Sequence, residues 1–458
     1  MSRSFVRDII KIFSFLPGAF IFLALNTVSL SVKSQDVKSL TLQETIDLSI
    51  KNSHVLKASS AKIEEATAEV RQAMDNKLPN ASVSGSYLRL ANPTINLKTK
   101  AFGGGGSDTT GNNESVPHPN QAMYGIFNVS LPIFAGGKIR YGIESAKYLQ
   151  QATMLDADKD KEGVILNTIN AYINLYKASV TVNVVKENLL QSEHRDSVFR
   201  RLEQNGLLAR NDLLKAELQT SNISLSLLDA ESNLKIANVN MNLIIGYPET
   251  TVLKTDSTGF DKNLSVKTID EYEILALQDR KDIKALSFRR QAATTGILLA
   301  KADQYPTVAI TGGYIAADIP HVLSISNAVN IGVGLKYNIA SLWKTKAKIQ
   351  QAKSREMEVM ENEAQLSDAV RLQVNQGFEN LLLSQRKINV FEKAVAQSEE
   401  NYRITKNKYD NALVNTTDLL DANVSLLQSK INLAVAKADV LLAYSKLLET
   451  TGTLTNNQ

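Results

Sequence analysis

The hydrophobic positions of this chain follow two different periods. Apolar residues occupy every second position between Asn327 and Ile339, with asparagine, glycine and lysine between them. The same alternation is weaker in Tyr124–Phe134, and two shorter stretches show it at Val83–Tyr87 and Val308–Tyr314. A period of two residues predicts β-strands with one apolar and one polar face. We therefore expect four strands, which suit either a half-buried soluble sheet or the lipid-facing strands of a membrane barrel.

Most of the remaining chain is predicted to form long helices. It is rich in alanine, leucine, lysine and glutamate, and no proline occurs between Ile133 and Tyr247. The longest predicted helix, from about Lys138 to Gln204, would extend roughly 100 Å at 1.5 Å per residue. Shorter helices are expected at Leu42–Asn76 and Ile269–Ala302.

The last predicted helix carries an apolar seam with the spacing of a coiled coil. Nine positions alternate steps of four and three residues, and eight of them are apolar. They are Leu420, Val424, Leu427, Ile431, Ala434, Ala438, Leu441, Ser445 and Leu448. The equivalent stretch of the first half keeps Leu214, Leu218, Leu225 and Leu228 but interrupts the seam with serine and lysine. A long helix with such a seam has no core of its own and must pack against neighbouring helices.

The chain is an internal duplication. A shift of 227 residues places Thr41 on Thr268, and a shift of 206 residues places Asp212-Leu213-Leu214 on Asp418-Leu419-Leu420. The difference corresponds to a polar, glycine-rich loop at 92–121 in the first half. We predict a first repeat at 35–250, a linking segment at 247–267, a second repeat at 268–452 and a tail at 453–458. Each repeat holds a helix, two strands and a helical hairpin, with tips near 206–212 and 412–418.

The N-terminus has the pattern of a secretory signal peptide. Arg3, Arg7 and Lys11 precede an uncharged run from Ile12 to Val32. Its 21 residues are also long enough for a retained membrane anchor, but Pro17-Gly18 and the polar residues after Leu25 favour the signal peptide. We expect residues 1–34 to be removed on export.

Composition excludes several classes of function. The 51 basic and 47 acidic residues give a net charge of +4, too little to indicate nucleic-acid binding. Cysteine is absent, and the four histidines lack metal-ligand spacing, so no metal, no cofactor and no enzyme activity are predicted.

Four strands cannot close a membrane barrel, for which about eight is the usual minimum. An open sheet edge in hydrocarbon would leave backbone groups unpaired, each costing several kcal/mol. If the strands enter a membrane, several copies must therefore join. The strand number alone leaves two or three copies open.

The whole pattern resembles the TolC family of outer-membrane efflux and secretion channels. The resemblance rests on the duplicated organisation, on Asn128–Lys138 as a strand-to-helix junction, and on the paired tip segments Gly206–Ala216 and Ala412–Ala422. It implies a mainly helical chain that forms a homotrimer, with four strands per copy in a 12-stranded barrel above a periplasmic α-helical barrel. Residues 247–266 and the termini would form an equatorial belt.

The resemblance also implies function and partners. The chain would be a passive exit duct in the outer membrane of a Gram-negative bacterium, serving a tripartite efflux or type I secretion system. A periplasmic adaptor protein and an inner-membrane RND or ABC transporter would open it. The alternative is a coiled-coil scaffold that spans the envelope and has no channel.

Some residues match functional positions of the family. Asp418 and Asp421 match an acidic ring at the periplasmic end of the tunnel, although Asp418 also suits a helix cap with Asn415 and Thr416. Asp212 and Tyr409 match a contact that holds the tunnel closed, although Tyr409 also suits simple packing.

The predicted adaptor contact lies at the two hairpin tips. It comprises Gly206, Leu207, Leu208, Ala412, Leu413 and Val414. Val414 stands where the family has a latch arginine, and Ala412 stands where glycine is usual. We expect closure in this chain to depend more on apolar contacts.

Overall fold

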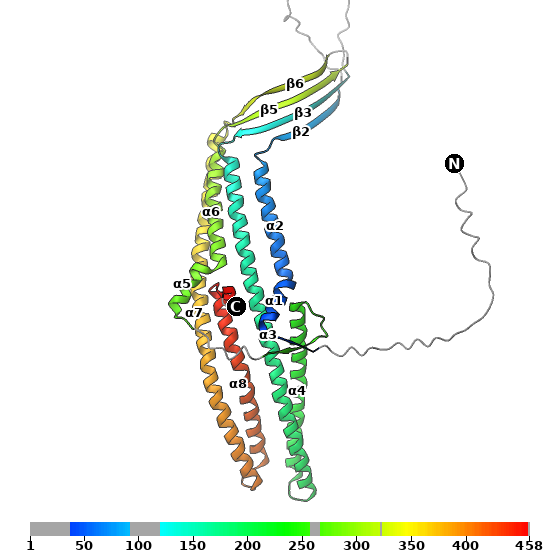
Figure 1. Ribbon diagram of the computed structural model, residues 1–458, viewed down its shortest axis with the longest axis vertical. Helices are drawn as coiled ribbons and strands as arrows, with labels where there is room; N and C mark the ends of the chain where they lie inside the picture. The colour runs from blue at the N-terminus through cyan, green and yellow to red at the C-terminus, as the bar shows by residue number, and fades with distance from the viewer. Residues whose placement is uncertain (1–36, 92–119, 257–265, 321–322, 457–458) are drawn as a thin grey trace, which may run out of the picture.

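The computed structural model describes residues 37–91, 120–256, 266–320 and 323–456. Figure 1 shows an elongated molecule with a sheet at one end and the tips of the long helical hairpins at the other. The predicted signal peptide and residues 92–119 of the predicted loop lie outside the described residues. In the part that is described, no helix is both long enough and apolar enough to cross a membrane.

The same order of elements occurs twice along the chain. The first set is α1 (Leu42–Asn52), α2 (His54–Asp75), β2 (Asn80–Arg89), β3 (Gln121–Phe134), α3 (Lys138–Gln204) and α4 (Arg210–Ile245). The second set is α5 (Ile269–Asp279), α6 (Lys281–Ala302), β5 (Thr307–Ile319), β6 (Leu323–Lys336), α7 (Ser341–Asp410) and α8 (Thr416–Thr450). Two short strands, β1 (Val37–Leu40) and β4 (Val252–Thr255), and a 3-10 turn at Leu454–Asn456 complete the described elements.

Strands β2, β3, β5 and β6 form one antiparallel sheet in that order. All four predicted strands are confirmed, but the predicted limits of the last strand are wrong. It begins at Leu323 rather than Asn327, because a bulge opposite Ala316 interrupts the alternation. Asn327 lies in this bulge with a φ of 59°. The sequence pattern therefore revealed only the part of β6 that follows the bulge.

The sheet has one apolar face and one polar face. A row across the apolar face joins Val83, Phe127, Tyr314 and Val329. This face is uncovered: Val83 is 82% exposed and Val329 is 78% exposed. The next residues along β6 with the same orientation, Ile331, Val333 and Leu335, are also exposed.

The polar face is tightly packed at its centre. One row joins Ser82, Asn128, Gly313 and Asn330. A Cβ at position 313 would lie 2.6 Å from the carbonyl oxygen of Phe127 and 3.0 Å from Oδ1 of Asn128. Glycine is therefore required where two asparagine side chains converge over β5.

Each short helix of the prediction is broken into two. Ser53 has an extended backbone with ψ 121° and separates α1 from α2, and its side chain caps α2. Arg280 has ψ 129° and separates α5 from α6. The predicted continuous helices Leu42–Asn76 and Ile269–Ala302 are therefore wrong at one residue each. The two breaks are 227 residues apart, as the duplication requires.

A parallel strand pair near the middle of the molecule was missed. β1 pairs with β4, from Val37 opposite Val252 to Leu40 opposite Thr255. Tyr172 of α3 anchors this pair, because its hydroxyl lies 2.9 Å from the Leu40 carbonyl and accepts a hydrogen bond from the Asp256 amide. Strands of four residues are too short to show a clear alternation.

Helix α8 lies between α3 and α7 and uses two seams. On one side, Ala438 and Leu448 pack with Ile165 and neighbouring isoleucines of α3. On the other side, Val440 and Leu447 pack with residues of α7 that include Leu381. The predicted single seam is therefore only half of the contact. Val424, one of its members, is 42% exposed.

Among the described residues, the corresponding seam of α4 has no packing partner. Leu214, Leu218, Leu225 and Leu228 are between 49% and 64% exposed. We call these four residues the α4 stripe. The side of α4 that packs within the chain instead presents Leu213, Ala216 and Ile223. The α4 stripe therefore remains open to a further helix.

Candidate functional site

The two helical tips share one backbone design. At the first tip, Gly206 has a φ of 74°, and the amide of Leu207 donates to the carbonyl of Leu202 at 2.9 Å. At the second tip, Ala412 has a φ of 56°, and the amide of Leu413 donates to the carbonyl of Lys408 at 2.8 Å. Both are left-handed C-caps that turn the chain sharply. Alanine tolerates this conformation less well than glycine does.

The apolar residues of each tip divide into an outer and an inner position. Leu207 is 75% exposed and Leu413 is 73% exposed, so both point away from the bundle. Leu208 is partly buried against a cluster that includes Phe199 and Leu213. Val414 is also only partly exposed. Each tip thus presents one free leucine at the end of the molecule.

The α8 tip begins with a reciprocal cap. The Asn415 side chain accepts a hydrogen bond from the Asp418 amide at 3.0 Å, and the Asp418 carboxylate accepts one from the Asn415 amide at 3.3 Å. The capping interpretation of Asp418 is confirmed, with Asn415 as the N-cap residue. Asp418 remains exposed, as does Asp421 one turn later. Capping therefore leaves both carboxylates exposed on the surface of a single copy.

Tyr409 packs between the two hairpins. Its ring stacks on Phe199 of α3 with centroids 5.4 Å apart, and Thr416 is its hydroxyl partner at 3.5 Å. Asp212 pairs with Lys215 at 3.6 Å. Burial, with the negative charge of Asp212 adding to it, raises the pKa of Tyr409. In this single copy Asp212 acts on Tyr409 through its charge, and the latch contact between the two residues stays a prediction.

A buried polar layer above the tips was missed by the sequence reasoning. Asn188, Ser192 and Asp196 follow one another at four-residue intervals along α3, and all three are buried. Asn188 donates to Oδ1 of Asn423 of α8 at 3.2 Å. The signal that could have revealed this layer is the polar four-residue spacing on an otherwise apolar helix face.

Arg195 belongs to the same layer. It lies 3.8 Å from Asp196, and its side chain is only 12% exposed. Burial lowers the pKa of this guanidinium and raises the pKa of Asp196. Among the described residues, its Nε and Nη2 atoms have no hydrogen-bond partner. The interior of the bundle near the tips is therefore polar and incompletely paired, which is unusual for a helix contact that only provides stability.

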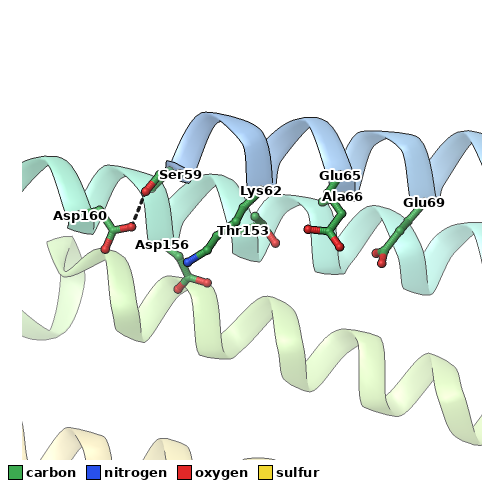
Figure 2. A pocket seen from close by; sticks show the side chains of 9 residues that line it. Ser59, Lys62, Glu65, Ala66, Glu69, Thr153, Asp156 and Asp160 are labelled. Atoms are coloured by element: carbon green, nitrogen blue, oxygen red, sulfur yellow. Dashed lines mark hydrogen bonds between the residues drawn. The ribbon is translucent and has the colours of Figure 1, made fainter. Parts of the chain in front are cut away.

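An acidic cleft of about 380 Å³ lies between α2 and α3 (Figure 2). Glu65, Glu69, Asp156 and Asp160 line it. Two of these carboxylates are already paired: Asp160 accepts a hydrogen bond from Ser59 at 2.6 Å, and Asp156 pairs with Arg289. Within the described residues, no group of three potential metal ligands was found. The contacts of Asp160 with Ser59 and of Asp156 with Arg289 join α3 to α2 and to α6.

Comparison with known proteins gives the family. The model of the outer membrane efflux protein family matches residues 45–247 and 274–453, which form most of both repeats. The outer membrane efflux protein BepC of Brucella suis biovar 1 (strain 1330) is 21% identical over 412 residues, covering 88% of this chain and 89% of BepC. The outer membrane protein TolC of Escherichia coli (strain K12) is 24% identical over 335 residues, covering 68% of this chain. That match spans 65% of TolC, which is just under two thirds of its length.

Solved structures show the same fold. CusC superposes with a TM-score of 0.76 at 17% identity, covering 90% of this chain and 92% of that chain. The CmeC outer membrane channel of Campylobacter jejuni superposes with a TM-score of 0.72 at 18% identity, covering 90% and 86%. Together with the family match, they confirm the predicted family, fold class and outer-membrane location. This chain belongs to the outer membrane efflux protein family.

Proposed function

We propose that the chain is the passive outer-membrane exit duct of a tripartite efflux or secretion system. The observation that carries this proposal is the four-stranded sheet. Within the described residues, its edge strands β2 and β6 pair with no further strand, and its apolar face is exposed. Open edges are incompatible with a lone copy in lipid, whereas an apolar face is what contact with lipid requires. Three copies joined from β2 to β6 would give twelve strands and a closed barrel with its polar face inside.

The α4 stripe supports the same assembly. It exposes four leucines on a side of the helix that no other described part of the copy covers. A second copy that packs against this stripe would bury it and extend the ring of helices below the sheet. The helical part would then enclose a duct continuous with the barrel.

The tips are the proposed point of control. The exposed Leu207 and Leu413 would contact a periplasmic adaptor, which in turn would link the duct to an inner-membrane RND or ABC transporter. Asp418 and Asp421 of three copies would place six carboxylates around a narrow axis and favour cations. Tyr409 and Asp212 would hold the closed state, and we expect Tyr409→Phe to raise single-channel conductance.

Reconstitution in planar bilayers tests the proposal. Mature protein purified in detergent should migrate as a trimer without heating and as a monomer after boiling, and it should form cation-selective pores. A stable oligomer that never conducts would support the coiled-coil scaffold instead. A folded monomer that needs no detergent would contradict both the barrel and the duct.

A further inference from the structure

The returning helix of each repeat ends at a similar joint. Helix α4 ends at Gly246, whose φ is 77°, and the side chain of Asn52 donates to the Ile245 carbonyl at 2.6 Å. Asn52 lies at the break between α1 and α2. A Cβ at position 246 would lie 2.8 Å from Nδ2 of the Asn52 side chain. The end of α4 is therefore seated directly on this break.

The second joint repeats this geometry with a different side chain. Gly452 follows α8 with a φ of 68°, and a Cβ there would lie 2.9 Å from Cα of Arg280. Nη1 of Arg280 donates to the Thr450 carbonyl at 3.1 Å. A neutral amide caps α4, whereas a guanidinium caps α8. A positive charge at a helix C-terminus is favoured by the helix dipole.

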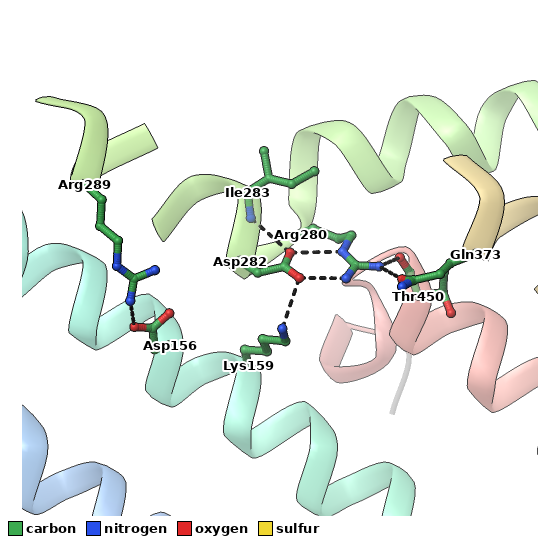
Figure 3. A network of polar contacts seen from close by, with 8 residues as sticks. All are labelled: Asp156, Lys159, Arg280, Asp282, Ile283, Arg289, Gln373 and Thr450. Carbon is green, nitrogen blue, oxygen red and sulfur yellow. Dashed lines mark hydrogen bonds and ion pairs between the residues drawn. The ribbon is translucent and has the colours of Figure 1, made fainter. Parts of the chain in front are cut away.

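Arg280 contacts further elements besides the end of α8. It forms two hydrogen bonds with Asp282 of α6, at 3.0 and 2.6 Å, and a third with Gln373 of α7 at 2.8 Å (Figure 3). Lys159 of α3 pairs with the same Asp282 at 3.1 Å. One guanidinium thus ties the end of α8 to α6 and α7 and, through Asp282, to α3.

This ion pair remains charged over the physiological pH range. Burial opposes ionisation of Asp282, but Arg280 and Lys159 outweigh it and lower the pKa of Asp282 to about 2. The side chains of Arg280 and Asp282 are only 11% and 12% exposed. A bidentate pair in such a site is geometrically specific as well as strong.

Two carboxylates, Glu162 and Glu449, lie beside the pair. Glu162 of α3 is 3% exposed, and its Oε1 atom has no hydrogen-bond partner within the described chain. It lies one turn before Ile165, which belongs to the same apolar cluster as Leu448 in the last turn of α8. Glu449 of α8 is the carboxylate that acts on it from that turn.

At each of these two carboxylates, neighbouring cations lower the pKa and neighbouring carboxylates raise it. Burial raises the pKa of Glu162 to about 7; Lys281 and Arg280 oppose the shift, and Glu449 and Asp158 add to it. Burial also raises the pKa of Glu449, against the charges of Arg280 and Lys159 and with a small contribution from Asp282. When both carboxylates are ionised, they repel each other across the contact between α3 and α8.

We propose that Arg280 is a positioning residue that fixes the upper end of α8, and that the charge on Glu162 decides how firmly α8 is held. Protonation of Glu162 removes its repulsion of Glu449 and seats α8 on α3. Ionisation loosens the joint, although Arg280 still caps Thr450. The proposal rests on the proposed function only in taking movement of α8 as part of opening.

Hydrogen exchange of the assembled protein in detergent tests the joint whether or not the protein conducts. In Arg280→Ala, amides at 447–453 should exchange about tenfold faster, because a charged hydrogen bond to the helix end is lost. Exchange at the end of α4 should not change. Asn52→Ala is the matched control and should give the opposite pattern, with faster exchange at 243–247 only.

Two further variants separate positioning from general stability. Arg280→Lys should restore part of the protection at 447–453, because an ammonium cannot make all the contacts of a guanidinium at once. Gln373→Ala removes only the contact with α7 and should produce a smaller loss. Equal acceleration throughout the chain in Arg280→Ala, or no change at 447–453, would overturn the positioning role.

The pH profile tests the role of Glu162. After correction for intrinsic exchange chemistry, protection at 447–453 should fall between pH 6 and pH 8 in the unaltered protein, with a midpoint near the Glu162 pKa of about 7. In Glu162→Gln, protection at 447–453 should stay high and independent of pH. Protection at the end of α4 should be independent of pH in both proteins. The same slope in Glu162→Gln as in the unaltered protein would reject the proposed control.

Discussion

Glu162 places a carboxylate inside the contact between α3 and α8, where it is almost completely buried. Its pKa is raised from 4.5 to about 7, so the folded protein binds a proton more tightly than the unfolded chain does. When folding raises the pKa of an acid, the stabilisation that is present below about pH 4.5 is lost as the pH rises through about 7. The ionised group therefore destabilises the fold at neutral and higher pH.

We expect Glu162→Gln to stabilise the protein at pH 8 by about 1–3 kcal/mol and to have little effect at pH 4.5. Thermal unfolding followed by far-ultraviolet circular dichroism at the two pH values measures this. Glu187→Gln, at an exposed position of the same helix, is the control and should change neither midpoint. A shift of equal size at both pH values would contradict the assigned burial effect.

The tips differ by one methyl group in a strained position. Ala412 has a positive φ where the equivalent residue is Gly206. We expect Ala412→Gly to stabilise the protein by up to about 1 kcal/mol and Gly206→Ala to destabilise it by about the same amount. No atom lies within 4 Å of the Cβ that Gly206→Ala adds, so its effect is limited to the backbone. Guanidinium unfolding midpoints should move in opposite directions, and a shift in the same direction would disprove the strain.

At the scale of elements, the sequence predicts the long helices and the four strands well. Helix α3 begins at Lys138 and ends at Gln204, as expected from the absence of proline. The breaks at Ser53 and Arg280 could not be predicted in this way, because each depends on one extended residue and on the end of another helix that packs beside it. The second seam of α8 was hidden because Val440 and Leu447 lie directly beside the first-seam residues Leu441 and Leu448 but contact a different helix.

The candidate site was predicted in parts. The reciprocal cap at Asn415 and Asp418 follows from local spacing, and the structure confirms it. The contacts of Tyr409 with Phe199 and Thr416 depend on how two hairpins pack, which the local sequence does not specify. Arg195 was invisible for the same reason, since a charged residue on a helix is usually exposed.

The α4 stripe yields a prediction about helix pairing between copies. Leu225→Glu should prevent or weaken assembly, because burial of each leucine contributes about 1.5–3 kcal/mol and a carboxylate would have no partner there. Ser226→Glu is the matched control, since it adds the same charge to an exposed neighbouring face of the helix. Light scattering after size-exclusion chromatography reports the mass of each variant. Equal loss of assembly in both would show that charge, rather than the stripe, is responsible.

At the scale of the whole molecule, the proposed trimer turns two exposed carboxylates into six. We expect Asp418→Ala with Asp421→Ala to reduce the cation-to-anion permeability ratio several-fold, measured as reversal potential across a salt gradient. Asp421→Ala alone separates selectivity from capping, because only Asp418 belongs to the cap. Thr417→Ala, at the exposed position immediately before Asp418, should leave the ratio unchanged. Unaltered selectivity in the double variant would contradict the proposed acidic ring.

The unpaired borders of the sheet have a consequence for biogenesis. A newly exported copy presents backbone donors and acceptors along β2 and β6 before any sister copy reaches it. Such borders join readily to any other extended chain, so crowded, unescorted copies would tend to aggregate. During maturation, correct strand pairing between copies should therefore compete with incorrect pairing, and the outcome should depend on the concentration of the chain. A holding chaperone that covers these borders would favour the productive route.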